Sequence, residues 1–347
     1  MNIIVVGPNY KNYKTASYQN EFMNALKDMS QNYFHYSNPK EIEINDLFKL
    51  AKFIPDIIFY NHGWLLDDPS LREIRYSKIK NSYLNKKIKH ILFLNKEYSR
   101  LNEKLKEIKR YKFDLIFTHL HNFDSGKNLS IPSRFLPLAC SYENISKYRK
   151  RKLKDRKYDL FFSGILQNWN FEKSQNDLRK RIQTELFYCF FDFPILKKYK
   201  YSDLNIYWKP FYKSRIKNLI SNLLHSKRLN QKDYFNTLTN SKCVLHTSSP
   251  IGIISTRIFE ALGSGAIGLF SRNSNADIIF KENIDYISFD SIRDLINKVY
   301  LVKRTINHSK FQTIADFGRE HVELKHTWRN RAAFFKQNVE KLLISLK

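Results

Sequence analysis

Short apolar runs alternate with amphipathic stretches from the start of the chain. The runs at residues 3–6, 56–60, 90–94 and 114–118 predict buried strands, and the stretches at 15–29, 71–85 and 98–110 predict helices between them. Strands of this kind, separated by helices, are typical of a parallel sheet that is covered on both faces. The first third of the chain is therefore predicted to form an α/β domain.

The same alternation restarts further along the chain. Strands are predicted at 158–162, 205–208, 243–246, 266–270 and 286–289, with helices at 176–190, 234–240 and 292–302. Turn residues and prolines between 122 and 157 mark a domain boundary. We expect domains at 1–140 and 158–330, a basic linker at 141–157 and a C-terminal helix at 331–347. Ligands of such sheets bind beyond the carboxyl ends of the strands.

The segment 248–270 carries the clearest chemical signal. It predicts a loop, a short helix with Arg257 and Glu260 on one face, a glycine break and a buried strand. Ser255 and Thr256 fall at the start of the helix, where free backbone N–H groups and the helix dipole attract phosphate. Arginine suits phosphate groups and glutamate suits ribose hydroxyls, so the segment predicts a nucleotide diphosphate site. The alternative is that Arg257 and Glu260 form only a surface ion pair, which would contribute little to stability.

Composition and charge limit the possible functions less than the segment 248–270 does. An apolar content of 42% in 347 residues fits a globular protein, and the net charge of +27 favours anionic partners. The run Lys147–Lys157, with eight Lys or Arg in eleven residues, predicts either a solvated linker or a patch against anionic membrane. The cysteines show no zinc or disulfide spacing. The N-terminus enters a strand without a signal peptide, so we expect a cytoplasmic protein, with the inner membrane face as an option.

Two motifs resemble those of a known family. The run Arg257-Ile-Phe-Glu-Ala-Leu-Gly-Ser-Gly265 and the later His326-Thr-Trp-Arg-Asn-Arg331 are similar to the C-terminal half of GT-B glycosyltransferases, especially the CgeB-type branch. The resemblance covers about 158–335, and residues before it match only in their alternation. It implies two doubly wound, Rossmann-like domains facing a central cleft, with the last helix crossing back to the first domain.

The resemblance also implies an activity. A GT-B enzyme of this kind moves a hexose from a nucleotide-diphosphate sugar to a glycan, lipid-linked or protein acceptor, as in cell-surface polysaccharide biosynthesis. It implies no cofactor and no metal, because a helix dipole and cationic side chains neutralise the leaving diphosphate. UDP is the first expectation for the donor nucleotide and GDP the second. The donor-binding residues that it implies are Ser163, Gly164, Ser255, Thr256, Arg257 and Glu260.

One departure leaves the stereochemistry open. Many retaining GT-B enzymes carry Glu-x7-Glu, and the first Glu of that pattern is Gly252 here. An inverting enzyme needs a base on the acceptor hydroxyl. The catalytic candidates are His62 first and His119 next, with His121 and Asp124 as further options, since each follows a predicted strand. Near the end of the chain, His326 is expected to be a structural pin between the two domains and Trp328 a core residue.

Two other functions remain open from the sequence. A basic chain with 21 Tyr and 27 Phe could bind nucleic acid, although no known nucleic-acid-binding module appears and the charge is spread over both halves. The chain could also be an inactive glycosyltransferase-like protein that acts as an assembly partner, because the first Glu of the retaining pattern is missing.

Overall fold

The computed structural model describes most of the chain and divides it into two compact units. The described residues are 1–7, 17–37, 42–61, 79–80, 88–94, 97, 101–111, 113–123, 130–148, 151–165, 182, 187–188, 198–199, 203–211, 229–249, 252–307 and 309–344. The first unit consists of Met1–Leu138 and Trp328–Lys347, and the second unit of Ala139–Thr327. The chain therefore leaves the first unit once and returns to it at its C-terminal end.

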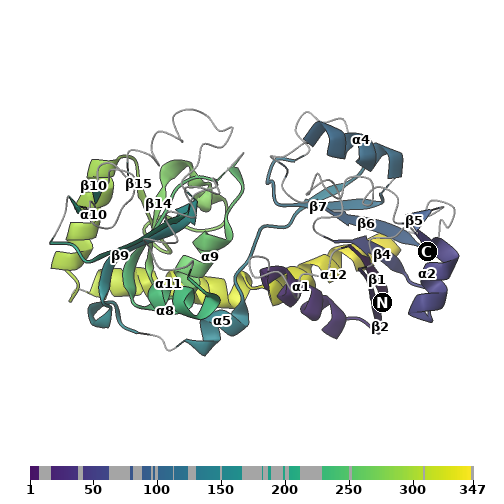
Figure 1. Cartoon of the computed structure of the whole chain (residues 1–347), viewed down its shortest axis with the longest axis horizontal. Helices are drawn as coiled ribbons and strands as arrows, with labels where there is room; N and C mark the ends of the chain where they lie inside the picture. The colour runs from purple at the N-terminus through teal and green to yellow at the C-terminus, as the bar shows by residue number, and fades with distance from the viewer. Residues whose placement is uncertain are drawn as a thin grey trace. The chain divides into compact units, whose positions relative to one another are not determined.

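A parallel sheet forms the centre of the first unit (Figure 1). In the described residues its strands lie in the order β2-β1-β4-β6-β7-β8, and every neighbouring pair is parallel. Their bounds are Asn32–Tyr36 (β2), Asn2–Val6 (β1), Ile57–Tyr60 (β4), Lys89–Phe93 (β6), Leu115–Thr118 (β7) and Ser133–Phe135 (β8). The four strands expected from the apolar runs are confirmed as β1, β4, β6 and β7.

Helices cover both faces of this sheet. Helices α1 (Ser17–Asp28) and α12 (Trp328–Ile344) contact each other on one face. Helices α2 (Ile44–Ala51) and α4 (Leu101–Tyr111) lie on the other, where Leu47 and Ile108 pack with Ile58. Right-handed crossovers explain this arrangement. From β1 the chain passes through α1 to β2, and from β6 it passes through α4 to β7, which lies in the opposite direction along the sheet. The two helices therefore lie on opposite faces.

Aromatic rings attach α12 to the first unit. Phe335 is fully buried, and its ring lies 4.8 Å from that of Phe59 and 4.9 Å from that of Phe117. Phe22 of α1 contacts the ring of Trp328, which is 1% exposed, at 5.8 Å. The expectations of a core Trp328 and of a last helix that returns to the first domain are thereby confirmed.

The second unit repeats the architecture with a parallel sheet in the order β12-β9-β13-β14-β15. Its strands are Ile206–Phe211 (β12), Tyr158–Ile165 (β9), Ser241–His246 (β13), Ile267–Ser271 (β14) and Ile287–Phe289 (β15). Its main described helices are Tyr142–Lys147 (α5), Gln231–Thr239 (α8), Thr256–Gly263 (α9), Ile292–Arg304 (α10) and Ser309–Lys325 (α11). Side chains of β9, β13 and β14 pack with α10 and α11 in one core, which includes Leu160, Leu269 and Leu295.

The basic segment 141–157 differs from the expected linker, since it belongs to the second unit. Arg156 is 3% exposed and donates to the carbonyls of Ser241 (2.9 Å) and Ser264 (3.0 Å), the latter at the C-terminal end of α9. A cation is favourable there because the helix dipole is negative. Burial, with help from the charge of Arg319, lowers the pKa of Arg156 to about 9. Part of the basic run is therefore structural.

Two helix predictions are wrong where the structure describes them. Within 71–85, Ile79–Lys80 form strand β5, which pairs with β3 (Ile42–Glu43). Within 176–190, Phe187–Tyr188 form β10, which pairs antiparallel with β11 (Lys198–Tyr199), although Ile182 is helical. Each of these short strands depends on a partner elsewhere in the chain, and a local amphipathic pattern carries no information about that partner. The remainder of both stretches lies outside the described residues.

No helix in the described ranges is long and apolar enough to cross a bilayer.

Two adjacent phenylalanines test the attachment of α12. Phe335→Ala should lower the free energy of unfolding by about 3–5 kcal/mol, because it removes a fully buried ring from the aromatic core. Phe334→Ala, at a side chain that is 40% exposed, should cost less than about 1 kcal/mol. Urea denaturation of both variants measures the difference. Equal losses would contradict the burial of α12 in the first unit.

Candidate nucleotide-binding site

The carboxyl ends of the second sheet bring the predicted donor residues together. Ser163 and Gly164 lie near the end of β9, and the loop after β13 leads into α9. Since β9 and β13 are parallel neighbours, the end of β9 and the start of α9 occur at the same edge of the sheet. This edge is where open α/β sheets bind ligands.

Helix α9 begins with a side-chain cap. Ser255 is the N-cap residue, and its hydroxyl oxygen accepts a hydrogen bond from the backbone N–H of Arg257 at 3.2 Å. The cap satisfies one of the first backbone donors, while the positive end of the dipole still faces this edge. The helix therefore starts where the sequence predicts it, with Thr256 as its first residue.

The guanidinium of Arg257 lies against Gly164. A methyl group at Gly164 would come within 2.6 Å of Nη1 of Arg257, so a larger residue there would displace the guanidinium from this position. Two residues 93 positions apart in the sequence thus form one surface, as the donor-site prediction requires. A guanidinium beside a helix N-terminus is suited to bind a diphosphate.

Glu260 lies one turn further along α9 and has a partner that the sequence did not reveal. The hydroxyl of Tyr234, in α8, donates to Oε2 of Glu260 at 2.8 Å. Burial raises the pKa of Glu260, and the hydrogen bond from Tyr234 and the charge of Arg257 oppose that rise. Burial and the charge of Glu260 raise the pKa of Tyr234 well above its ordinary value, so the phenol remains a hydrogen-bond donor. The carboxylate is thereby held in a fixed orientation.

The loop before α9 is anchored to the end of β14 at two points. The hydroxyl oxygen of Ser271 accepts a hydrogen bond from the backbone N–H of Ser248 at 3.0 Å. The side-chain amide of Asn275 donates to the carbonyl of Gly252 at 3.0 Å. Gly252 has φ +76°, and a methyl group there would lie 2.3 Å from Nδ2 of Asn275. The glycine that replaces the first Glu of the retaining pattern is therefore part of a fixed turn.

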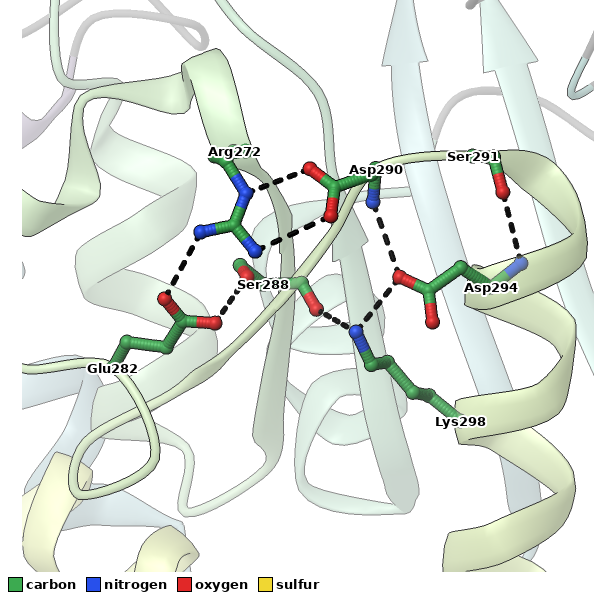
Figure 2. Close-up of polar contacts among 7 residues, drawn as sticks. All are labelled: Arg272, Glu282, Ser288, Asp290, Ser291, Asp294 and Lys298. Atoms are coloured by element: carbon green, nitrogen blue, oxygen red, sulfur yellow. Dashed lines mark hydrogen bonds and ion pairs between the residues drawn. The ribbon is translucent and has the colours of Figure 1, made fainter.

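A polar network surrounds the ends of β14 and β15 (Figure 2). Arg272 donates to both carboxylate oxygens of Asp290, at 2.7 and 3.2 Å, and to Glu282 at 3.4 Å. Glu282 also accepts a hydrogen bond from the hydroxyl of Ser288. The other members of the network are Ser291, Asp294 and Lys298. Arg272 and Asp290 are more than half exposed, so their energetic contribution is small, but their two parallel bonds fix the segment that carries Asn275.

The catalytic candidates belong to the first unit. His119 is 3% exposed, and its Nδ1 lies 2.8 Å from the carbonyl of Leu136. Burial lowers the pKa of His119, so the ring is neutral at pH 7. His121 is exposed, with its ring 5.2 Å from that of Phe135. His62 and Asp124 lie outside the described residues.

The motif at 326–331 spans the return of the chain to the first unit. In the second unit, the carbonyl of His326 accepts a hydrogen bond from the backbone N–H of Cys140 at 3.0 Å, and its ring lies 5.7 Å from that of Phe259. In the first unit, Arg331 donates to the carbonyls of Pro137 (2.9 Å) and Leu138 (3.2 Å). Burial lowers the pKa of Arg331 to about 9. Each end of the motif therefore holds the neighbouring backbone inside its own unit.

Comparisons with known proteins agree with this architecture. Residues 194–337 match the family described as glycosyl transferase-like. An alpha-glucosyltransferase in complex with UDP-glucose and DNA is 11% identical, with a TM-score of 0.62 over 96% of this chain and 98% of that chain. A glycosyltransferase from Rickettsia africae is 12% identical, with a TM-score of 0.60 over 99% of this chain and 98% of that one. The chain has the GT-B glycosyltransferase fold.

A third GT-B structure similar to this chain is Anabaena HepE in complex with UDP and glucose. It is 10% identical, with a TM-score of 0.57 over 98% of this chain and all of that chain. A search of curated proteins by sequence finds no match. Within the described ranges, no three His, Cys, Asp or Glu side chains gather where they could hold a metal ion.

The partly buried Glu260 should give this GT-B protein a distinctive pH dependence. Because the folded state raises the pKa of Glu260 above its unfolded value of about 4.3, it favours the protonated acid. Stability from this group is fully present below the unfolded pKa and is lost as pH rises through the raised folded pKa. Glu260→Gln should remove this loss, so its stability relative to wild type should increase across that interval. Urea denaturation as a function of pH measures the difference, and a constant difference would contradict the burial of the charge.

Proposed function

We propose that this protein is a glycosyltransferase that transfers a hexose from a nucleotide-diphosphate sugar, with UDP as the first candidate nucleotide and GDP as the second. The observation that carries the proposal is the position of the Arg257 guanidinium against Gly164 at the start of α9. Arg257 binds the diphosphate together with the backbone N–H of Thr256, since the N–H groups of Arg257 and Ile258 already donate to Ser255. Glu260 accepts hydrogen bonds from the ribose hydroxyls. Ser163, Ser255 and Thr256 line the same edge.

Neutralisation of the leaving diphosphate needs no metal in this proposal. A guanidinium and the positive end of a helix both stabilise the negative charge that develops as the bond to the anomeric carbon breaks. Nucleotide binding should therefore persist in EDTA.

The first unit holds the acceptor in this proposal, with His62 and His119 as candidates for contacts to the reacting sugars. The acceptor is a glycan, a lipid-linked glycan or a protein, and the setting is the synthesis of cell-surface polysaccharide or glycoconjugates in the cytoplasm. The exposed lysines of the basic run, Lys152, Lys154 and Lys157, would allow peripheral contact with anionic membrane.

Nucleic acid is a further acceptor class to be tested. Two structures of an alpha-glucosyltransferase that are similar to this chain contain DNA, and this chain carries a net charge of +27. Incorporation of labelled sugar into DNA, compared with incorporation into glycan and lipid-linked acceptors, would separate these classes.

A thermal-shift panel of nucleotides and nucleotide sugars tests the donor site. A ligand at 100 times its Kd should stabilise the folded protein by about 2.7 kcal/mol. Arg257→Met and Glu260→Ala should each abolish most of the shift for whichever nucleotide gives it, because they remove a diphosphate and a ribose contact respectively.

Arg293→Met is the matched control for the donor site. Arg293 is exposed on α10, so its substitution removes the same charge without touching the start of α9. It should keep the wild-type shift. A normal shift in Glu260→Ala, or equal losses in Arg257→Met and Arg293→Met, would overturn the assignment of the site.

A further inference from the structure

A buried carboxylate lies at the carboxyl edge of the sheet in the first unit. Glu97 follows β6, which lies between β4 and β7 in the sheet. The strands are parallel, so the residues that follow β4, β6 and β7 begin at the same edge. No motif of the sequence singles out Glu97.

The two oxygens of this carboxylate have different surroundings. Oε1 accepts hydrogen bonds from the hydroxyl of Thr118 at 2.7 Å and from the backbone N–H of His119 at 2.8 Å. Oε2 is buried and has no hydrogen-bond partner among the described residues. The whole residue is 1% exposed. One oxygen therefore fixes the end of β7, and the other is held in place without a hydrogen-bond donor in the described part of the chain.

An unused acceptor on a buried carboxylate is costly, because water is excluded from the lone pairs. Proteins retain such groups where a ligand completes the hydrogen bonding, and the cost to stability is then part of function. We propose that Oε2 of Glu97 accepts a hydrogen bond from a sugar hydroxyl of the acceptor substrate. This inference rests on the glycosyltransferase function proposed above.

The charge at this position selects the chemistry of the acceptor. A carboxylate repels a phosphate or a carboxyl group and attracts a hydrogen-bond donor. The neighbouring His119 is buried, and its pKa is lowered, so the imidazole is neutral and does not offset the charge. A hydroxyl of a carbohydrate fits Oε2, whereas the phosphate of a lipid carrier would have to lie elsewhere.

Glu97→Gln is a sharp probe of this proposal. The amide oxygen can still accept the hydrogen bonds of Thr118 and His119, while Oε2 is replaced by an NH₂ group that donates. The donor is the nucleotide sugar with the largest shift in the panel above, and the acceptor probe is methyl β-D-glucopyranoside. Transfer should fall roughly ten- to a hundred-fold through a higher KM for the acceptor probe, with an unchanged Kd for the nucleotide.

Thr118→Val distinguishes the roles of the two oxygens of Glu97, because it removes a donor to Oε1 and leaves Oε2 unchanged. It should lower Tm and keep the wild-type KM for the acceptor probe. Glu97→Gln should have a Tm equal to or above that of wild type, since it removes a buried charge and keeps the bonds at the other oxygen. A lower Tm for Glu97→Gln, or an unchanged KM for the acceptor probe, would overturn the proposal.

The comparison of Tm values needs no substrate and tests whether the carboxylate of Glu97 lowers the stability of the free protein, whereas the KM for the acceptor probe tests the contact with a sugar hydroxyl. Failure of the proposed glycosyltransferase function would appear separately, as the absence of any nucleotide-induced shift in the wild-type protein.

Discussion

Parallel pairing of strands is the constraint on which both candidate sites depend. A strand that pairs in parallel with its neighbour must end at the same edge of the sheet, and the chain must then cross back through a helix. In the second unit this brings the glycine at the end of β9 beside the start of α9, although 93 residues separate Gly164 from Arg257. In the first unit it places Glu97 and His119 at one edge. The pairing of strands, more than any single motif, assembles the chemistry.

The sequence predicts those parts of the fold that one strand or helix can encode by itself. The central strands of both sheets are buried on both faces, so their apolar runs stand out. The cap at Ser255, with Arg257 and Glu260, marks α9. Prediction fails at β5 and β10, where two residues form a strand by pairing with another segment of the chain. The basic run shows a related limit, since nothing local distinguishes the buried Arg156 from the exposed lysines beside it.

The same limit explains which contacts of the candidate site the sequence did not predict. Tyr234 reaches Glu260 from a different helix, and Asn275 reaches Gly252 from the far side of β14. Each contact joins residues more than twenty positions apart, and neither partner belongs to a motif that names the other. In the proposed donor site these contacts would hold the partners of the phosphate and ribose groups rigid, so they belong to the candidate site as much as the residues of α9 do.

The return of α12 to the first unit has a consequence for biosynthesis. The aromatic core of that unit includes Trp328 and Phe335, which the ribosome adds only after the whole second unit has been made. The sheet at the start of the chain must therefore wait, with the rings of Phe22, Phe59 and Phe117 still uncovered, while the second unit emerges and folds. An early-made segment with exposed aromatic surface is a natural client for chaperones, and slow translation would lengthen that exposure.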